Sequence, residues 1–491
     1  MDTKRKLMIT GIACAILVVV LGIVCISAAC TKDENRFVYE QQGSVYVIKD
    51  IKNSFRSGWF GKKKLVVPAT HKGKPVEVKK IESPCLEELV ISDGVTAIYE
   101  SAFSNNAKLT KVVLPDSLTY IGSGALSNCL NLTEVKLPAN LSSIASALFK
   151  NCPQLSIVAL PNTVKTIGAN AFEGCKNLTN IALPTSLTDI ESGAFANSGI
   201  TSLTIPQGVT EISENLAKGC AALTSVTLPD ATVSIDENAF ADCSLLAAIN
   251  IPSSVTSIES NAFDNCAASL LKKYQGGLYI GNTTNPYAIL LKKDNTVTDD
   301  AIITDLTLHS NTKIIANKAF ANNQVLQSVT ANNGLTIIGN NAFSNCAALE
   351  TVNLSDSVTV IGDNAFFKNE KLAVVTKNGA PLEMASIQTS LNAFVNTAYF
   401  KELALKNNGL VVSQEVLFGI VNDVLAESVA KGSSTDYEFY LSLQDRTDNK
   451  ITKIRVVGEE KKIMIYVVTL KDENEVLSTY LSVNAKYENQ Q

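Results

Sequence analysis

The sequence is poor in the side chains that usually carry chemistry. It has two histidines, His71 and His309, and its cysteines include no C-x-x-C pair of the kind that zinc sites use. His309 is followed by Ser310, but sequence neighbours do not form the geometry of a catalytic triad. The acidic residues are scattered over the turns and mark no carboxylate pair. We therefore predict no catalytic residue, no metal site and no cofactor, and a protein that is not an enzyme.

An excess of charge of one sign is also missing. Charged residues make up 18% of the chain and the formal net charge is -5, with no block of Lys and Arg that could follow a phosphate backbone. Nucleic acid is therefore excluded as an expected partner. Apolar residues reach 46%, which is enough for a folded core and too much for a disordered chain.

The N-terminus carries the only targeting signal that we find in the sequence. Three basic residues, Lys4, Arg5 and Lys6, precede an apolar run over residues 7–29. This pattern is typical of an export signal, and the run is also long enough to span a bilayer uncleaved. Its end, I-S-A-A-C at residues 26–30, resembles a bacterial lipoprotein processing site, at which Cys30 would be lipidated. Lipidation, an uncleaved anchor and simple secretion all stay open, and both anchors place the rest of the chain outside the cytoplasm.

One phrase of 23 residues recurs along most of the chain. Its clearest copy is LSIVALPNTVKTIGANAFEGC at residues 155–175. The aromatic slot of the phrase is filled by Phe103, Leu126, Phe149, Phe172, Phe195, Ala217, Phe240 and Phe263, and again by Phe320, Phe343 and Phe366. A fixed period of this length is typical of a solenoid, in which each unit buries its apolar face against its neighbours. Broad binding surfaces are therefore expected, rather than a deep cleft.

Each repeat predicts two short strands and a turn. The piece L-T-x-V-x-L-P alternates with period two, which indicates a strand, and a proline such as Pro161 ends it because proline cannot donate to a sheet. The piece V-T-x-I indicates a second short strand. The piece A-F-x-x-C is expected to form a tight helical turn that buries its Phe. The predicted fold class is a β-rich solenoid.

Departures from this rhythm divide the chain. Residues 1–30 form the anchor, and residues 31–85 predict a tether and an N-terminal β cap with a hairpin turn at residues 71–74. Repeats occupy residues 86–408, with an insert at residues 269–300. The insert is expected to leave the array as a hairpin, with strands at residues 277–280 and 287–291.

Beyond residue 408 the rhythm stops, and a small α+β domain is predicted over residues 409–491. Ser413 is expected to cap a helix whose apolar positions recur near every 3.6 residues. Those positions are Val416, Leu417, Ile420, Val421, Val424 and Leu425. Three or four strands follow, at residues 437–443, 450–457, 462–470 and 476–483.

The repeats resemble the BspA-type leucine-rich repeat family of bacterial and protist surface proteins. The resemblance is carried by LTEVKLP at residues 132–138, VKTIGANAFEGC at residues 164–175 and LTIIGNNAFSNC at residues 335–346. It covers roughly residues 64–400, and GGLYIGNTTNPY in the insert is similar to a hairpin found within such arrays. The resemblance implies a leucine-rich repeat solenoid. It also implies a surface adhesin or a binder of host proteins, and nothing for the C-terminal domain.

A cysteine recurs at the end of the repeat. It is present as Cys129, Cys152, Cys175, Cys220, Cys243, Cys266 and Cys346. Stacked rungs about 4.8 Å apart bring such residues within disulfide range, but their side chains point the same way, into the core. We expect buried free thiols that pack as small hydrophobic groups, with disulfides between rungs as the alternative.

The solvent-facing positions of the first strand give the candidate binding surface. From Asn180 onward they are mainly small, uncharged, hydrogen-bonding residues, and they include Asn180, Ser202, Thr204, Ser225, Thr227 and Asn250. They include no aromatic residue, which disfavours sugar binding by ring stacking. In the insert, Tyr274, Tyr279 and Tyr287 lie among lysines, a composition typical of interface hot spots. Each surface also has a purely structural explanation. The strand positions would then be a solvated sheet face, and the tyrosines of the insert would pack the hairpin on the array.

Three functions follow from this sequence. The first is a surface-anchored, non-catalytic binding protein that engages protein on a host or neighbouring cell through its repeats. In the second, the repeats are a spacer that presents the C-terminal domain as a binding or enzymatic module. In the third, the chain is an envelope-structural protein. We favour the first, with the membrane reached only through the N-terminal anchor on the outer face of a bacterial cell.

Overall fold

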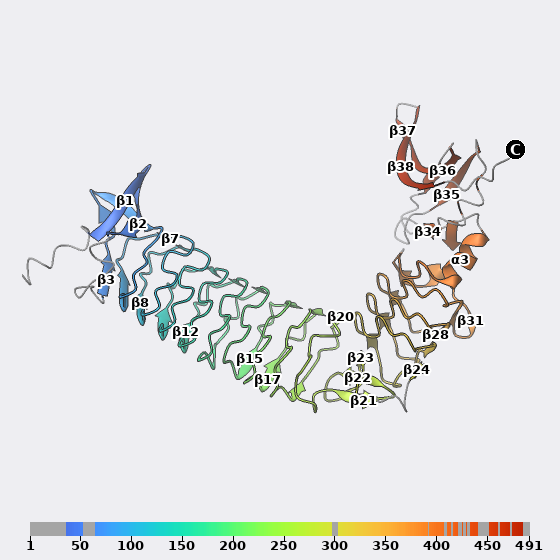
Figure 1. The fold of residues 1–491 in the computed structure, drawn as a ribbon, viewed down its shortest axis with the longest axis horizontal. Coiled ribbons are helices and arrows are strands. Elements are labelled where there is room, and N and C mark those ends of the chain that lie inside the picture. The colour runs from blue at the N-terminus through green and yellow to red at the C-terminus, as the bar shows by residue number, and fades with distance from the viewer. Residues whose placement is uncertain are drawn as a thin grey trace, which may run out of the picture. The chain divides into compact units, whose positions relative to one another are not determined.

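The computed structural model in Figure 1 describes residues 36–52, 64–296, 303–390, 392–406, 410–413, 416–420, 425, 429, 433–439, 451–459, 462–471 and 474–484. The chain packs as two compact units. Unit 1 is Met1–Pro229 with Asp242–Leu245, and unit 2 is Asp230–Ala241 with Leu246–Gln491. The division between the units falls inside the repeats.

Unit 1 begins with the predicted β cap. Strands β1 (Phe37–Gln42) and β2 (Val45–Ile51) pair antiparallel, and β2 pairs parallel with β5 (Lys74–Val78). Strand β4 (Thr70–His71) and β5 form the hairpin that was predicted at residues 71–74. Ile48 of β2 has no exposed surface, so this small sheet covers the apolar face of the first rung.

Each rung of unit 1 contributes to two parallel ladders of strands. The first-strand ladder is formed by β3 (Lys64–Val67), β6 (Glu88–Ile91), β8 (Lys111–Val113), β10 (Glu134–Lys136) and β12 (Ile157–Ala159), and, separately, by β15 (Ser202–Thr204) and β17 (Ser225–Thr227). The second-strand ladder is formed in separate parts by β7 (Ala97–Ile98) with β9 (Tyr120–Ile121), by β11 (Ser143–Ile144), β13 (Thr166–Ile167) and β14 (Asp189–Ile190), and by β16 (Glu211–Ile212). Paired residues are 23 positions apart, as in Val135↔Val158, so the strand periodicity read from the sequence is confirmed.

Unit 2 also contains first and second strands. Its first strands are β19 (Ala248–Ile249), β24 (Asp305–Thr307), β26 (Ser328–Thr330), β28 (Thr351–Leu354) and β30 (Val374–Lys377), the last followed by β31 (Ala380–Pro381). Its second strands are β18 (Ser234–Ile235), β20 (Ser257–Ile258), β25 (Ile314–Ile315), β27 (Ile337–Ile338), β29 (Val360–Ile361) and β32 (Gln388–Thr389). A short 3₁₀ helix, η3 (Met384–Ser386), precedes β32.

The insert forms a hairpin, but it does not leave the array. Strands β21 (Lys272–Tyr274), β22 (Gly277–Ile280) and β23 (Ile289–Lys293) pair antiparallel in sequence order, and β23 then pairs parallel with β25. The rung before the insert and the rung after it also contact each other directly, through a parallel β-bridge between Glu259 and Asn317. The expectation of a protruding hairpin is therefore wrong. The apolar strand β23 is better buried as the first member of a new ladder than exposed to water.

The A-F-x-x-C piece forms a third ladder instead of a helical turn. Two residues per turn, such as Ala147 and Asn151, have left-handed φ angles of 54° and 56°, which interrupts a helix. The N–H groups of Ser101, Phe103 and Asn105 then donate to carbonyl oxygens of the next rung, at 2.8, 2.8 and 2.9 Å. We call this set of bonds the turn ladder.

Aromatic rings stack inside the turn ladder. In unit 1 the ring centroids of Phe149, Phe172 and Phe195 are 5.5 Å apart at each step, and all three side chains have no exposed surface. In unit 2, Phe343 and Phe366 stack with the same 5.5 Å separation. The repeat of the aromatic slot therefore produces runs of stacked, buried rings in each unit, and the predicted burial of the Phe is confirmed.

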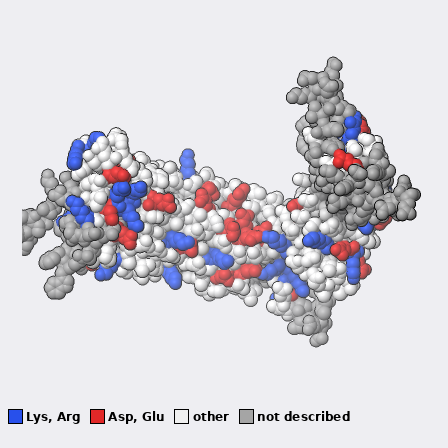
Figure 2. Space-filling model, turned by 45° about the horizontal axis from the view of Figure 1, so that its top comes forward, with Lys and Arg blue, Asp and Glu red and all other residues white. Residues whose placement is uncertain are grey.

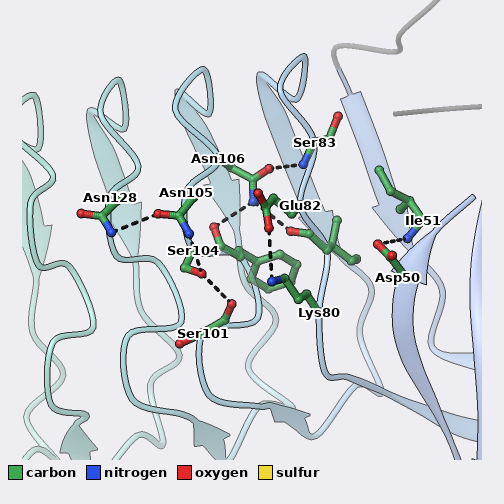
Figure 3. Close-up of polar contacts among 12 residues, drawn as sticks. Asp50, Ile51, Lys80, Glu82, Ser83, Ser101, Ser104, Asn105, Asn106 and Asn128 are labelled. Atoms are coloured by element: carbon green, nitrogen blue, oxygen red, sulfur yellow. Dashed lines mark hydrogen bonds and ion pairs between the residues drawn. The ribbon is translucent and has the colours of Figure 1, made fainter. Parts of the chain in front are cut away.

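The recurring cysteine is free wherever the structure describes it, and it also donates a hydrogen bond. The Sγ of Cys175 lies 3.2 Å from the carbonyl oxygen of Phe149 in the preceding rung, and the other six cysteines of this slot make the same contact at 3.0–3.4 Å. Where the slot holds asparagine, the amide takes over. Figure 3 shows Asn106, whose Nδ2 donates to the carbonyls of Ile81 and Phe103. This position of the repeat therefore requires a small side chain that donates a hydrogen bond to the preceding rung. The sequence analysis did not predict this requirement.

The repeats end against helix α3 (Ala398–Leu405). Thr397 caps it by accepting a hydrogen bond from the N–H of Phe400 at 3.0 Å, and Phe400 and Tyr399 are buried. The hairpin of β33 (Leu410–Ser413) and β34 (Val416–Ile420) follows. The helix predicted from Ser413 is wrong over residues 416–420, because these β-branched and apolar residues pair with β33. Val421 and Val424 lie outside the described residues.

Four strands form an antiparallel sheet in the order of the sequence. They are β35 (Ser434–Phe439), β36 (Thr452–Gly458), β37 (Lys462–Lys471) and β38 (Asn474–Asn484). The predicted strands at 450–457, 462–470 and 476–483 are confirmed, and the first begins three residues earlier than predicted. Asp436 accepts from Arg455 Nε at 2.6 Å and Nη2 at 2.7 Å, and these bonds hold the pKa of its carboxyl well below the usual range.

The slot cysteines are expected to resist alkylation in the native protein. Burial raises the pKa of Cys152 and of Cys346 to about 12, so at pH 8 almost none of either thiol is in the reactive thiolate form. Iodoacetamide should leave both unmodified while it labels the half-buried Cys85, as read by peptide mass spectrometry. A urea-denatured sample is the control, and labelling of Cys152 at the rate of Cys85 would contradict the buried slot.

Candidate functional site

The residues between the buried positions of the first-strand ladder form an open face. In β15 and β17 the outward side chains Ser202, Thr204, Ser225 and Thr227 are exposed, whereas the central residue of each strand is buried. Asn250, which follows β19 in unit 2, is also exposed. The structure thus places these predicted residues on the solvent side of the ladder, as the period of two requires.

Charge is unevenly distributed along this face. In unit 1 the first rungs expose Lys111, Glu134 and Lys136, whereas the outward positions from Ile157 to Thr227 carry no charge. On the face of the molecule drawn in Figure 2, basic and acidic side chains are interspersed over a mainly uncharged surface. The C-terminal rungs of unit 1 therefore offer neutral hydrogen-bonding groups, mostly hydroxyls, and no electrostatic attraction to a polyanion.

The first-strand ladder of unit 1 is interrupted at one rung. Strand β12 is the last member of one sheet, β15 is the first member of another, and residues 180–182 between them are in no strand. From the side of β15, the N–H of Thr201 still donates to the carbonyl of Thr179 at 3.0 Å. Asn180 and Ala182 nevertheless keep their outward, exposed orientation, and Ile181 stays buried in the core.

A hollow lies over this break. Its volume is about 320 Å³, and Asn180, Thr185, Ser202 and Thr204 line it together with small apolar residues. Three of these four residues were predicted from the sequence as members of the binding surface. The hollow itself was not predicted, because the loss of strand pairing leaves no mark in the alternation of apolar and polar residues.

The break coincides with the one short repeat. The step from Phe195 to Ala217 is 22 residues, because Gly199 alone connects Ser198 to Ile200 where other repeats have two residues. The Gly199 backbone passes so close to the preceding rung that an added Cβ would lie 1.9 Å from the carbonyl oxygen of Lys176. The short step was visible in the sequence and was the one available signal of the break.

The tyrosines of the insert are mostly used for packing. Tyr279 has no exposed surface, so its place in the predicted binding surface is corrected. Its ring meets those of Tyr274 and Tyr287 edge-on, at 6.2 and 5.7 Å. Tyr287 stacks on His309 at 4.0 Å, and both Tyr274 and Tyr287 are half-buried. Burying the apolar rings against one another removes more surface from water than an exposed patch would.

A second hollow in unit 2 was missed by the sequence analysis. It has a volume of about 300 Å³ and lies between β30, β31 and α3, with Val374, Leu382, Met384 and Glu402 in its lining. Tyr399 closes its floor and donates from its hydroxyl to the carbonyl of Leu382 at 2.9 Å. Helix α3 was not predicted, so its contribution to a site could not be either.

Two features of the described residues bear on the other predicted sites. These residues hold no group of three or more His, Cys, Asp and Glu side chains that could bind a metal ion. Among them, too, no helix has the length and apolar character needed to cross a bilayer. The apolar run at residues 7–29 and Cys30 lie outside the described residues.

Comparison with known proteins identifies the repeats. A model of the BspA type leucine rich repeat region matches in six copies, over residues 81–172, 142–269 and 294–419. No curated protein matches the sequence.

The chain is also similar to several solved structures. A leucine-rich repeat protein from Bacteroides ovatus is 18% identical, with 75% of this chain and 95% of that chain covered and a TM-score of 0.35. A leucine rich cell surface protein from Faecalibacterium prausnitzii is 23% identical, with 74% and 91% covered and a TM-score of 0.30. A leucine rich repeat protein from T. pallidum is 23% identical, with 43% and 88% covered and a TM-score of 0.30.

Replacement of Gly199 by alanine should destabilise unit 1. The added methyl group has no room beside the Lys176 carbonyl, and overpacking of this kind costs about 1–3 kcal/mol. Urea unfolding followed by circular dichroism measures the change. The exposed substitution Ala159→Ser is the control and should stay within about 0.5 kcal/mol. Equal midpoints for the two variants would show that the short connection is not tight.

Proposed function

Because the chain belongs to the BspA-type leucine-rich repeat family, we propose that it is a non-catalytic binding protein of the bacterial cell surface. In this proposal the outward face of the first-strand ladder engages protein on a host or neighbouring cell. The observation that carries it is the uncharged, exposed run of outward residues from Asn180 to Thr227, with a hollow at its start.

The chemistry of this face favours a protein partner. Hydroxyl and amide side chains donate and accept hydrogen bonds and lose little conformational entropy when bound. The outward positions of β15 and β17 hold neither aromatic rings for stacking on a sugar nor cations for a phosphate. A broad, neutral, hydrogen-bonding sheet face fits another polypeptide better than either of those ligands.

A spacer role for the repeats is the second candidate. The strands β35–β38 form a sheet of their own, and Asp436, Lys453 and Arg455 form a charged cluster on it. If the ligand bound to that sheet, substitutions on the ladder face would leave binding unchanged.

Membrane attachment through residues 1–30 completes the proposal. Lipidation at Cys30 is supported by the small residues that precede this cysteine, and an uncleaved anchor over residues 7–29 is supported by the length of the apolar run. In either form the repeats would stand outside the cytoplasm.

Charge added to the ladder face should weaken cell binding. In the double variant Ser202→Arg, Ser225→Arg, two cations replace hydroxyls on the proposed contact surface, so binding of the labelled protein to intact cells should fall at least tenfold. Flow cytometry before and after protease treatment of the cells measures the binding and tests for a protein receptor. The matched control is Thr188→Arg with Thr210→Arg, which adds the same charge beside the second strands. Full binding by the ladder variant would refute the role of this face.

Processing at Cys30 has a direct test. The membrane fraction of cells that make the protein should yield an N-terminal peptide that begins with a lipid-modified Cys30, as read by mass spectrometry. A Cys30→Ser variant should keep its leader peptide. Recovery of an unprocessed peptide that starts at Met1 would show that the apolar run itself is the anchor.

A further inference from the structure

We infer that a gap in a row of asparagine side chains, on the turn ladder of unit 1, binds the side-chain carboxamide of a partner protein, with glutamine as the best fit. The inference goes beyond the first-strand face and adds a second contact on another side of the rungs. It rests on the proposed function only in taking the partner to be a protein.

The row is formed by the asparagine that follows the aromatic slot by two positions. The Nδ2 of Asn128 donates to Oδ1 of Asn105 at 3.1 Å, as Figure 3 shows, and the Nδ2 of Asn151 donates to Oδ1 of Asn128 at 3.0 Å. In unit 2 the same bond joins Asn345 to Asn322 at 2.7 Å. Each amide therefore donates to the rung before it and can accept from the rung after it, as in other asparagine ladders.

One rung of unit 1 lacks this amide. The position has a left-handed φ, 57° at Asn128 and 56° at Asn151, which asparagine tolerates and glycine adopts without strain. Gly174, with a φ of 74°, occupies it in the next rung, and Asn197 in the rung after that. The row therefore loses one carboxamide while the backbone keeps its course, and Asn151 and Asn197 are two rungs apart, roughly 9.6 Å.

The two asparagines face this gap with opposite groups. The Oδ1 of Asn151 lies 2.8 Å from the place that a Cβ on Gly174 would take, so an acceptor points into the gap. The Oδ1 of Asn197 faces the following rung at Gly219, which turns its Nδ2 back toward Gly174. Within the part of the chain that the structure describes, neither Oδ1 of Asn151 nor the side chain of Asn197 has a hydrogen-bond partner.

A hollow of about 480 Å³ lies over the gap, within the range of about 300–1,000 Å³ that is usual for ligand sites. Amide and apolar groups line it together, from Asn128, Asn151, Gly174, Asn197, Leu130 and Pro153. Its two charged lining residues, Glu173 and Lys176, have opposite signs, and Glu173 is paired with Lys150 at 2.7 Å. The hollow therefore has room for a side chain and no excess charge to attract an ion.

These groups fit a neutral side chain with a terminal amide and an apolar stem. A carboxamide brings an N–H for Oδ1 of Asn151 and a carbonyl oxygen for Nδ2 of Asn197, so it completes the row. The methylene groups of glutamine can cover Leu130, which is apolar but 47% exposed. A carboxylate has no donor for Asn151, and the lining has no aromatic ring on which a sugar could stack.

Saturation-transfer difference NMR with the intact chain tests this recognition. The probe is glutamine blocked by an acetyl group and a methylamide, and its side-chain methylene protons should receive saturation from the protein. Blocked methionine keeps the same main-chain amides but has no carboxamide, and blocked N,N-dimethylglutamine keeps the side-chain carbonyl but has no N–H there. Both controls should give signals at least fivefold smaller. A signal from either control equal to that of glutamine would overturn recognition of the carboxamide.

An N-acetylated sugar also carries one amide N–H and one carbonyl oxygen. N-acetylglucosamine, measured in the same way, should give a signal at least fivefold smaller than that of blocked glutamine. A larger signal from the sugar than from glutamine would overturn the assignment of the gap to a protein side chain.

Filling the gap locates the site. Gly174→Asn restores the missing amide at a φ that asparagine adopts in the neighbouring rungs, and the added Cβ meets first the mobile end of the Asn151 side chain. The glutamine signal should fall at least fivefold. Lys368→Asn is the matched control, because it places asparagine at the same position of a rung in unit 2, with a φ of 60°, and should keep the full signal. Equal signals from the two variants would exclude the gap.

A second variant removes the donor without filling the gap. Asn197→Asp keeps the size of the side chain and loses its N–H groups, and Asp242 shows that aspartate adopts this position, with a φ of 62°. The glutamine signal should again fall at least fivefold, so this variant decides the question if Gly174→Asn does not fold. An undiminished signal would contradict the role of Asn197.

The gap and the proposed function fail separately. If blocked glutamine gives no signal while the double variant Ser202→Arg, Ser225→Arg loses cell binding, the proposed function stands and the gap fails. If glutamine binds in the gap while that double variant still binds cells fully, the gap stands and the proposed role of the first-strand face fails.

Discussion

The stacking of one rung on the next is the interaction on which the rest of the molecule depends. Ordering a residue costs about 1–2 kcal/mol of backbone conformational entropy, and a lone rung with both faces in water cannot offset that cost. In the stack, Phe172 lies 5.5 Å from Phe149 on one side and from Phe195 on the other, so both of its faces are covered. The end rungs have a neighbouring rung on one side only, so another element must bury their second apolar face. Strands β1 and β2 do this before the first rung, and Phe400 of α3 does it after the last.

Much of the fold was predictable because it repeats. The alternation around Val135 and Val158 fixed which residues face inward, and the spacing of 23 fixed their pairing. What failed was local and not repeated. The apolar pattern of residues 416–420 fits one face of a helix as well as it fits a strand. Pairing with β33 stabilises the strand. The insert reads as a hairpin, yet whether β23 joins a ladder depends on β25, which lies more than twenty residues further along the chain.

The candidate site was predictable only in part. Period two places Ser202 and Thr204 in solvent, and the structure agrees. The hollow beside them depends on where the backbone of Gly199 runs, which one missing residue hints at but does not specify. Tyr279 shows the opposite error, since a tyrosine among lysines resembles an interface until its neighbours Tyr274 and Tyr287 are placed. The slot of Cys175 is similar, since its period is plain in the sequence, but its bond to the Phe149 carbonyl depends on how the preceding rung is placed.

The turn ladder gives each unit a direction. In ordinary sheets the peptide dipoles alternate and nearly cancel, but here Ser101, Phe103 and Asn105 all donate toward the following rung, and Phe366 and Lys368 do the same at Ala393 and Val395 near the last. One end of such a stack therefore offers carbonyl oxygens and the other offers N–H groups. The two ends are chemically unlike, so a closing element that suits one is unsuited to the other. Lengthening of the array by repeat duplication is then compatible only with copies inserted in the same orientation, between closing elements that keep their places.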